Sequence, residues 1–177
     1  HRPHGRRQLV PHPKLHTRVN CSGSKFFILH SSFFTLHSSK AMRKIDLIVI
    51  HCSATREDRP FPVENLIACH QARFGFTGYH YYITRDGQLY QTRHENLPGA
   101  HARHYNQHSI GVCYEGGLLA NGHPADTRTP EQKHALWALL KSLKVDYPDA
   151  QILGHCELPN VAKTCPNFLP SKEYATL

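Results

Sequence analysis

Residues 45–50 are apolar at every position except Asp46, and the run ends directly in His51. A run that is apolar at successive positions, rather than at alternate ones, is typical of a strand buried on both faces. Such strands occur in sheets whose two faces are covered by helices. The sequence therefore predicts a central strand that carries a histidine at its end.

Two segments have the spacing of amphipathic helices. One begins at Pro62, a residue that fits the first turn of a helix, and ends near Gly75. The other begins at Thr129, where Pro130 and Gln132 complete a proline start and a capping box, and its leucine stripe continues to about residue 147. Both helices are expected to pack one face against a sheet.

Four further segments read as strands. The Tyr- and Ile-rich residues 79–84 are followed by Asp86-Gly87, a hairpin turn signal, and by a short apolar segment at 89–91. Residues 109–114 and 151–154 complete the pattern. The order β, α, β-hairpin, β, α, β predicts an α/β fold, in which a single domain has a mixed central β-sheet flanked by helices.

The first 41 residues differ from the rest in composition. They hold seven Lys or Arg and no Asp or Glu, whereas the remaining 136 residues hold 14 basic and 13 acidic side chains. The only methionine of the chain is Met42. We expect residues 1–41 to be a basic extension, disordered or non-native, and residues 42–177 to form the domain. Two alternatives stay open, a poorly formed signal peptide around residues 26–36 and a basic arm that binds nucleic acid or anionic polymers.

The chemistry of the chain is concentrated near its C-terminus. His155 and Cys165 frame a Pro-containing loop, and Lys163 stands two residues before the cysteine. With His51 they provide three ligands, which is the number that a catalytic zinc takes when its fourth position stays open. The lysine would supply a positive charge for a developing oxyanion. These residues predict a zinc hydrolase. The spacing of the other cysteines predicts no disulfide framework, and Cys69 and Cys113 are expected to be buried thiols.

Several motifs in register match one family. The chain resembles the type-2 N-acetylmuramoyl-L-alanine amidases, especially the short bacteriophage lysozyme-type enzymes, which share a fold with the peptidoglycan recognition proteins. The resemblance covers nearly all of residues 43–170. The motifs that carry it are Ile48-Val49-Ile50-His51-Cys52-Ser53-Ala54-Thr55, Gly78-Tyr79-His80-Tyr81, Arg85-Asp86-Gly87, Gly99-Ala100-His101-Ala102, Tyr105-Asn106, Ser109-Ile110-Gly111-Val112, His155 and Lys163-Thr164-Cys165-Pro166.

The resemblance assigns roles to the residues at these positions. It implies one Zn²⁺ bound by His51, His155 and Cys165, with Tyr79 and Lys163 as catalytic residues. His101 and Asn106 are expected to bind substrate. A glutamate is catalytic in related cytoplasmic amidases, but here the corresponding position is Cys113, so Glu115 is expected to be a surface charge at the end of its strand.

The implied reaction is hydrolysis, by zinc-activated water, of the amide between the lactyl group of N-acetylmuramic acid and L-alanine in peptidoglycan. The alternative is a recognition module that binds peptidoglycan without cleaving it, although that branch of the family loses the cysteine ligand.

The expected partner is therefore peptidoglycan or a soluble muropeptide. No nucleic acid is expected on the folded domain, no segment is apolar enough to span a membrane, and the chain is expected to be a monomer. Without a convincing signal peptide, we expect synthesis in the cytoplasm. The enzyme would then act on the cell wall after release or lysis, as an endolysin does, or on cytoplasmic muropeptides.

Overall fold

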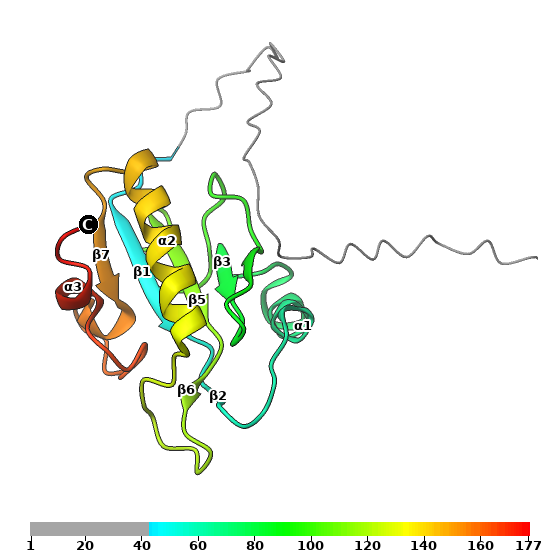
Figure 1. Cartoon of the computed structure of the whole chain (residues 1–177). Helices are drawn as coiled ribbons and strands as arrows, with labels where there is room; N and C mark the ends of the chain where they lie inside the picture. The colour runs from blue at the N-terminus through cyan, green and yellow to red at the C-terminus, as the bar shows by residue number, and fades with distance from the viewer. Residues whose placement is uncertain (1–42) are drawn as a thin grey trace, which may run out of the picture. The chain divides into compact units, whose positions relative to one another are not determined.

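The computed structural model describes residues 43–177, which form a five-stranded sheet with the strand order β4-β3-β5-β1-β7 and a separate pair, β2-β6 (Figure 1). The predictions about residues 1–41 and the start at Met42 lie outside these residues. The elements in chain order are β1 (Leu47–Cys52), β2 (Thr55–Arg56), α1 (Val63–Phe74), β3 (Tyr81–Ile83), β4 (Leu89–Gln91), β5 (Ser109–Tyr114), β6 (Gly117–Leu118), α2 (Pro130–Asp146), β7 (Gln151–Gly154), the 3₁₀ helix η1 (His155–Glu157) and α3 (Pro170–Glu173).

The central position of β1 confirms the prediction from its apolar run. All six of its residues are buried, and it pairs in parallel with β5 on one side and β7 on the other. Among the strands of residues 43–177 in this sheet, only β4 runs antiparallel to its neighbour. Because β1 and β7 run in the same direction, their carboxyl ends meet at one edge of the sheet, where open α/β sheets place their ligand sites. His51 and His155 are delivered to this edge.

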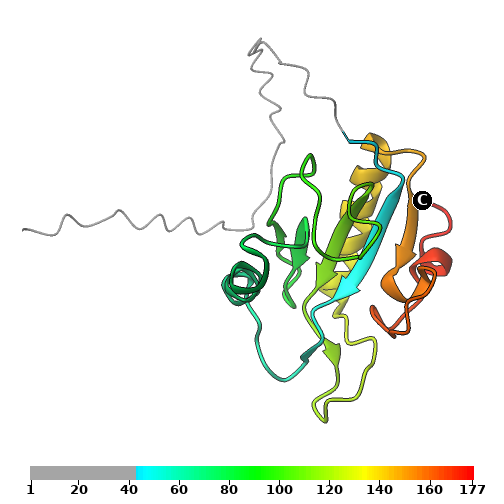
Figure 2. The same cartoon turned by 180° about the vertical axis from the view of Figure 1, so that it is seen from behind.

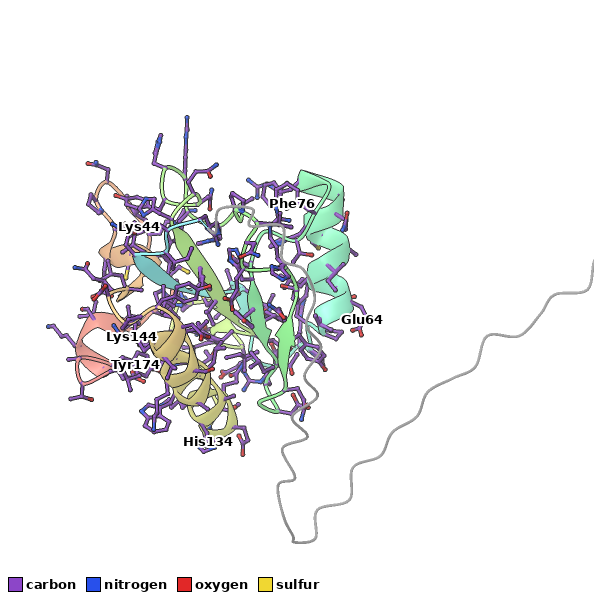
Figure 3. All side chains as sticks on the ribbon, turned by 90° about the horizontal axis from the view of Figure 1, so that it is seen from above. Lys44, Glu64, Phe76, His134, Lys144 and Tyr174 are labelled. Carbon is purple, nitrogen blue, oxygen red and sulfur yellow. The ribbon has the colours of Figure 1, made fainter. Side chains whose placement is uncertain are left out.

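The two faces of the sheet are covered differently. Ile48 and Ile50 of β1 point to the same face as Ile110 and Val112 of β5, and they form the largest apolar cluster with the leucines of α2. Figure 1 shows α2 lying along this face, and Figure 3 shows the side chain of His134 pointing away from the sheet. We call this side the α2 face.

The opposite face, which we call the site face, is seen in Figure 2. Val63 and Leu66 of α1 pack there against Tyr82 and Cys113, at the β3 side of the sheet. Because strand side chains alternate, His51 points to this face together with its register partner, Cys113. The metal ligands are therefore on the face that α2 leaves uncovered.

Local signals placed most element boundaries correctly. Thr129 caps α2 and Gln132 completes the capping box, as predicted. Gly75 ends α1 in the left-handed conformation with φ of 74°, which a residue with a β-carbon rarely adopts. The hairpin between β3 and β4 closes through a hydrogen bond from the backbone N–H of Thr84 to Gln88 O, 3.0 Å long.

Three expectations were incomplete or wrong. The two-residue strands β2 and β6 pair with each other and were not predicted, because so short an element has no period. Cys69 is exposed on α1 and is not a buried thiol, whereas Cys113 is buried as expected. Glu115 is not a surface charge, since only 4 % of it is exposed. Among residues 43–177, no helix has the length and apolar character that crossing a membrane requires.

Candidate metal centre

Three predicted ligands lie together at the carboxyl edge of β1 and β7. The ligand atoms of His51, His155 and Cys165 are all within 4.8 Å of one another. His51 is the penultimate residue of β1, and His155 opens η1 directly after β7. The Sγ atom of Cys165 lies 3.9 Å from His51 Nδ1. His51 and Cys165 are 114 residues apart in the sequence, and the fold brings them together.

The loop that carries Cys165 is held on both sides by backbone and side-chain hydrogen bonds. The backbone N–H of Cys52 donates to Cys165 Sγ over 3.2 Å, and the N–H of Cys156 donates to Cys165 O over 2.7 Å. The hydroxyl of Tyr114 donates to Pro166 O over 2.6 Å. The sulfur is therefore fixed against the end of β1 rather than left on a free loop.

The electrostatics of the cluster favour neutral imidazoles. Burial, and then the charges of His101, His155 and Lys163, hold the pKa of His51 well below its usual value. Burial and Lys163 lower the pKa of His155. Neutral imidazole is the form of histidine that binds a metal. Both side chains are thus kept in the form that a metal requires.

The pKa of the Cys165 thiol is raised, whereas those of the two histidines are lowered. Its hydrogen bond with Cys52, followed by burial, raises its pKa above the usual value, so an isolated thiolate is disfavoured there. A bound cation reverses this preference, because a coordinating thiol loses its proton outright. Two imidazole nitrogens and one sulfur at this spacing suit Zn²⁺ with one open position. The residues present therefore fit a zinc ion.

Tyr79 and Lys163 border the same cluster. The ring of Tyr79 lies 5.1 Å, centre to centre, from the ring of His51. Burial, and then the nearby thiols of Cys113, Cys165 and Cys52, raise the pKa of the Tyr79 hydroxyl well above its usual value, so the hydroxyl keeps its proton and can donate. Lys163 is exposed. Lys163 and His155 each border both of the cavities that are described next.

Two cavities adjoin at His155 and Lys163. One, of about 310 Å³, contains the three ligands and is closed on its other side by residues of α1. The second, of about 680 Å³, is lined mostly by apolar residues between the loop after Ala102 and the loop before Lys163. Sequence reasoning missed these linings because no periodic or motif signal marks a loop as one wall of a groove. The missed residues are His70, Arg73, Phe74, Arg103, His104, Leu158 and Val161.

His101 and Asn106 lie close to the centre but in different settings. The Nδ1 atom of His101 is 3.1 Å from His51 Nε2, on the side of that ring away from Cys165. The Oδ1 atom of Asn106 accepts the backbone N–H groups of His101 and Ala102, both over 2.9 Å, and so holds their loop. Substrate binding by either residue stays a prediction.

Glu115 has a structural setting that the sequence did not indicate. Its carboxylate accepts the backbone N–H of Phe61 over 2.6 Å and that of Arg85 over 3.0 Å. It thereby joins the segment before α1 to the β3-β4 hairpin. The expected surface charge is instead a buried connection between two loops, because hydrogen bonds offset the cost of burying a carboxylate.

Comparisons with known proteins point to one family. The family model described as N-acetylmuramoyl-L-alanine amidase matches residues 41–168. The endolysin of Klebsiella phage KP32 is 38% identical over 122 residues, which are 68% of this chain and 80% of that protein. The endolysin of Escherichia phage T7 is 36% identical over 130 residues, or 73% of this chain and 85% of that protein.

Solved structures give the same result. The N-acetylmuramoyl-L-alanine amidase LysC from Clostridium intestinale URNW superposes with a TM-score of 0.60 at 29% identity, over 73% of this chain and 82% of that chain. The predicted fold class is therefore confirmed.

Proposed function

The chain belongs to the N-acetylmuramoyl-L-alanine amidase family, and on that premise we propose that it binds one zinc ion at His51, His155 and Cys165 and cleaves the bond between N-acetylmuramic acid and L-alanine in peptidoglycan. The observation that carries the proposal is the convergence of these three ligand atoms within 4.8 Å in the lining of one cavity. When bound there, the zinc would polarise the scissile carbonyl and lower the pKa of water.

Lys163 is proposed to stabilise the negative charge that develops on the carbonyl oxygen. It borders the ligand cavity and the larger apolar cavity, so its ammonium group is within reach of a substrate that lies in both. A fixed positive charge is most effective where charge appears only in the transition state. We therefore expect Lys163 to act on the rate of cleavage more than on the affinity for zinc.

Tyr79 is proposed to donate a hydrogen bond at the same centre. Its hydroxyl keeps its proton because its pKa is raised by burial and the neighbouring thiols. A protonated hydroxyl beside the ligands can orient the substrate carbonyl or the attacking water, whereas a phenolate could not donate. The proposal thus assigns Tyr79 to orientation and Lys163 to charge.

The larger cavity is proposed to hold the part of the substrate that extends from the cleaved bond. It shares His155 and Lys163 with the ligand cavity, so one molecule can occupy both. Its apolar walls and the exposed Arg103 suit a short peptide with side-chain and carboxylate groups. Peptidoglycan, or a soluble fragment of it, has such a stem peptide next to the scissile bond.

The test is mass spectrometry of purified peptidoglycan after incubation with the zinc-loaded full chain. Cleavage by the proposed reaction releases free stem peptides whose N-terminal residue is L-alanine. Cys165→Ala should release none, because it removes one of three ligands. Cys69→Ala is the matched control, since this thiol is exposed on α1, and it should act like the unmodified chain.

Other outcomes would contradict the proposal. Intact muropeptides in the presence of one bound zinc and measurable binding to peptidoglycan would leave a recognition module without hydrolysis. Equal activity of the Cys165→Ala and Cys69→Ala variants would remove Cys165 from the metal site.

A further inference from the structure

We propose that His101 is a positioning residue, which fixes the proton of the His51 imidazole on Nε2 and thereby leaves Nδ1 free to bind the metal. The inference rests on the proposed zinc site. It assigns His101 to a contact with a ligand, whereas its sequence motif had suggested contact with substrate.

The two ring nitrogens of His51 face different partners. Its Nδ1 faces the sulfur of Cys165 over 3.9 Å, while its Nε2 faces His101 Nδ1 over 3.1 Å. A nitrogen that binds a metal must offer a lone pair, so the ring proton belongs on the other nitrogen. His51 therefore donates from Nε2–H, and His101 Nδ1 accepts.

The other ring nitrogen of His101 faces Ser109. Because its Nδ1 accepts, the proton of the neutral ring is on Nε2, which lies 3.3 Å from the Oγ atom of Ser109. A ring with its proton on Nε2 and a lone pair on Nδ1 is neutral, so the accepting role of Nδ1 fixes the charge of His101 as well as its tautomer. Ser109 is fully buried on β5. The three side chains form one directed series of hydrogen bonds, from His51 through His101 to Ser109.

The His101 ring occupies a space that two glycines leave open. A β-carbon at Gly111 would lie 2.5 Å from the Cγ and Cδ2 atoms of His101, and one at Gly99 would lie 2.6 Å from its Cδ2. Both glycines therefore leave room that the ring fills. Behind it, the ring of His80 stands 5.7 Å away, centre to centre. A ring packed in this way can hold the orientation of its partner.

The choice of histidine also affects the charge of the centre. The second partner of a metal-bound histidine is often a carboxylate, which adds a negative charge. His101 accepts the same hydrogen bond as a neutral group. With one thiolate and two neutral imidazoles, the zinc centre keeps a net positive charge, which favours polarisation of a carbonyl.

The first experiment reads the tautomers directly. Long-range ¹H–¹⁵N correlation spectra of the zinc-loaded full chain, with ¹⁵N-labelled histidine, report which ring nitrogen of each histidine is protonated. We expect a proton on Nε2 of His51 and on Nε2 of His101. A proton on Nδ1 of His101, or on both of its nitrogens, would overturn the proposal without any substitution that endangers folding.

The second experiment measures zinc affinity by competition with a chelator for His101→Asn and His101→Leu. The side-chain oxygen of asparagine branches from Cγ as His101 Nδ1 does, so it can accept from His51, whereas leucine cannot. We expect the leucine variant to bind zinc about 10- to 100-fold more weakly, and the asparagine variant to retain most of the affinity. His108→Leu is the control, because this half-exposed ring pairs with Asp46 away from the centre, and its zinc affinity should be unchanged.

The outcomes separate this proposal from the zinc site itself. Equal zinc affinity of the asparagine and leucine variants, at the level of the unmodified chain or far below it, would overturn the positioning role alone. Failure of the unmodified chain to bind zinc would overturn both proposals. Thermal unfolding of the metal-free variants shows whether a loss of affinity reflects a loss of fold.

Discussion

The α2 face and the site face of the same sheet are built by alternate residues of the same strands. On β1, Ile48 and Ile50 join the continuous apolar cluster under α2, whereas His51 points to the opposite face. On β5, Val112 joins that cluster, whereas its neighbour Gly111 leaves room for His101. A single strand thus contributes to the core and to the metal centre at successive positions.

The two faces differ in how continuous their apolar packing is. The α2 face buries one large apolar cluster, whereas the site face has two smaller clusters and also carries the imidazole of His51. Burying polar groups lowers stability unless each finds a partner. The site face accordingly relies on hydrogen bonds such as those from His51 to His101 and from Cys52 to Cys165. We infer that the α2 face supplies most of the folding free energy and the site face supplies the chemistry.

The largest expected effect is on the α2 face. Leu140 is fully buried in the cluster under α2, and Leu140→Ala should lower the free energy of unfolding by about 2–5 kcal/mol because it leaves a cavity. Urea unfolding of the metal-free chain measures this loss. Zinc affinity of the folded fraction should not change, and a parallel loss of affinity would show that the faces are not separable. Val145→Ala, at a residue that is 81% exposed, is the control and should change stability by less than about 0.5 kcal/mol.

The corresponding substitution on the site face removes the charge of Lys163. Lys163→Ala should lower kcat/KM for peptidoglycan on the order of 100- to 1000-fold, the range for removing one group that stabilises an oxyanion. Stability should be unaffected, because the side chain is exposed. Zinc affinity should stay the same or rise, since the lysine charge opposes a cation at His51 and His155. A fall in zinc affinity that matches the fall in activity would place Lys163 in metal binding instead.

The pH dependence of stability should arise mainly on the site face. Burial lowers the pKa of His80 from 6.5 to about 4, with a smaller opposing effect of its bond to Leu97 O. Between these values the unfolded chain binds a proton that the folded chain does not, so stability falls as the pH falls from above 6.5 and levels off below about 4. The loss from this one group is at most about 3 kcal/mol.

Chemical unfolding of the metal-free chain between pH 7.5 and 4, read as free energy against pH, checks this slope. His80→Asn should give a shallower slope than the unmodified chain, although its stability at pH 7.5 will be lower because His80 accepts from Gly111 N–H and donates to Leu97 O. Identical slopes for the two proteins would assign the acid sensitivity to other histidines.

Features that depend on adjacent residues could be predicted from the sequence. The buried strand before His51, the capping box at Thr129 and the end of α1 at Gly75 all have local signals, and the structure confirms them. The set His51, His155 and Cys165 was found by combining residue type with a family resemblance, and the structure brings their ligand atoms together.

Contacts between segments that are distant in the sequence could not be predicted. The contact between His101 and His51 requires the 99–102 loop to lie over the β1-β5 pair, and no local pattern specifies that placement. The burial of Glu115 depends on backbone groups of Phe61 and Arg85, which are distant in sequence. In both cases a polar residue looked available for substrate or solvent because its partners are on other segments.

The smallest expected effect tests whether the anchorage of α2 can be weakened without reaching the centre. The Oγ1 atom of Thr129 accepts the N–H of Gln132 over 3.1 Å and donates to Arg85 O over 2.7 Å, so it both caps α2 and holds it to the β3-β4 hairpin. Thr129→Ala should lower the free energy of unfolding by about 1–2 kcal/mol, and Thr129→Ser, which keeps the hydroxyl, should restore most of it.

Gln132 also donates to Ile83 O and Glu115 O, so the helix keeps a second attachment to the sheet. Zinc affinity and peptidoglycan cleavage by the folded alanine variant should therefore equal those of the unmodified chain. A selective loss of cleavage at unchanged stability would show instead that the α2 face transmits its position through the sheet to His51, and the two faces would then have to be treated as one unit.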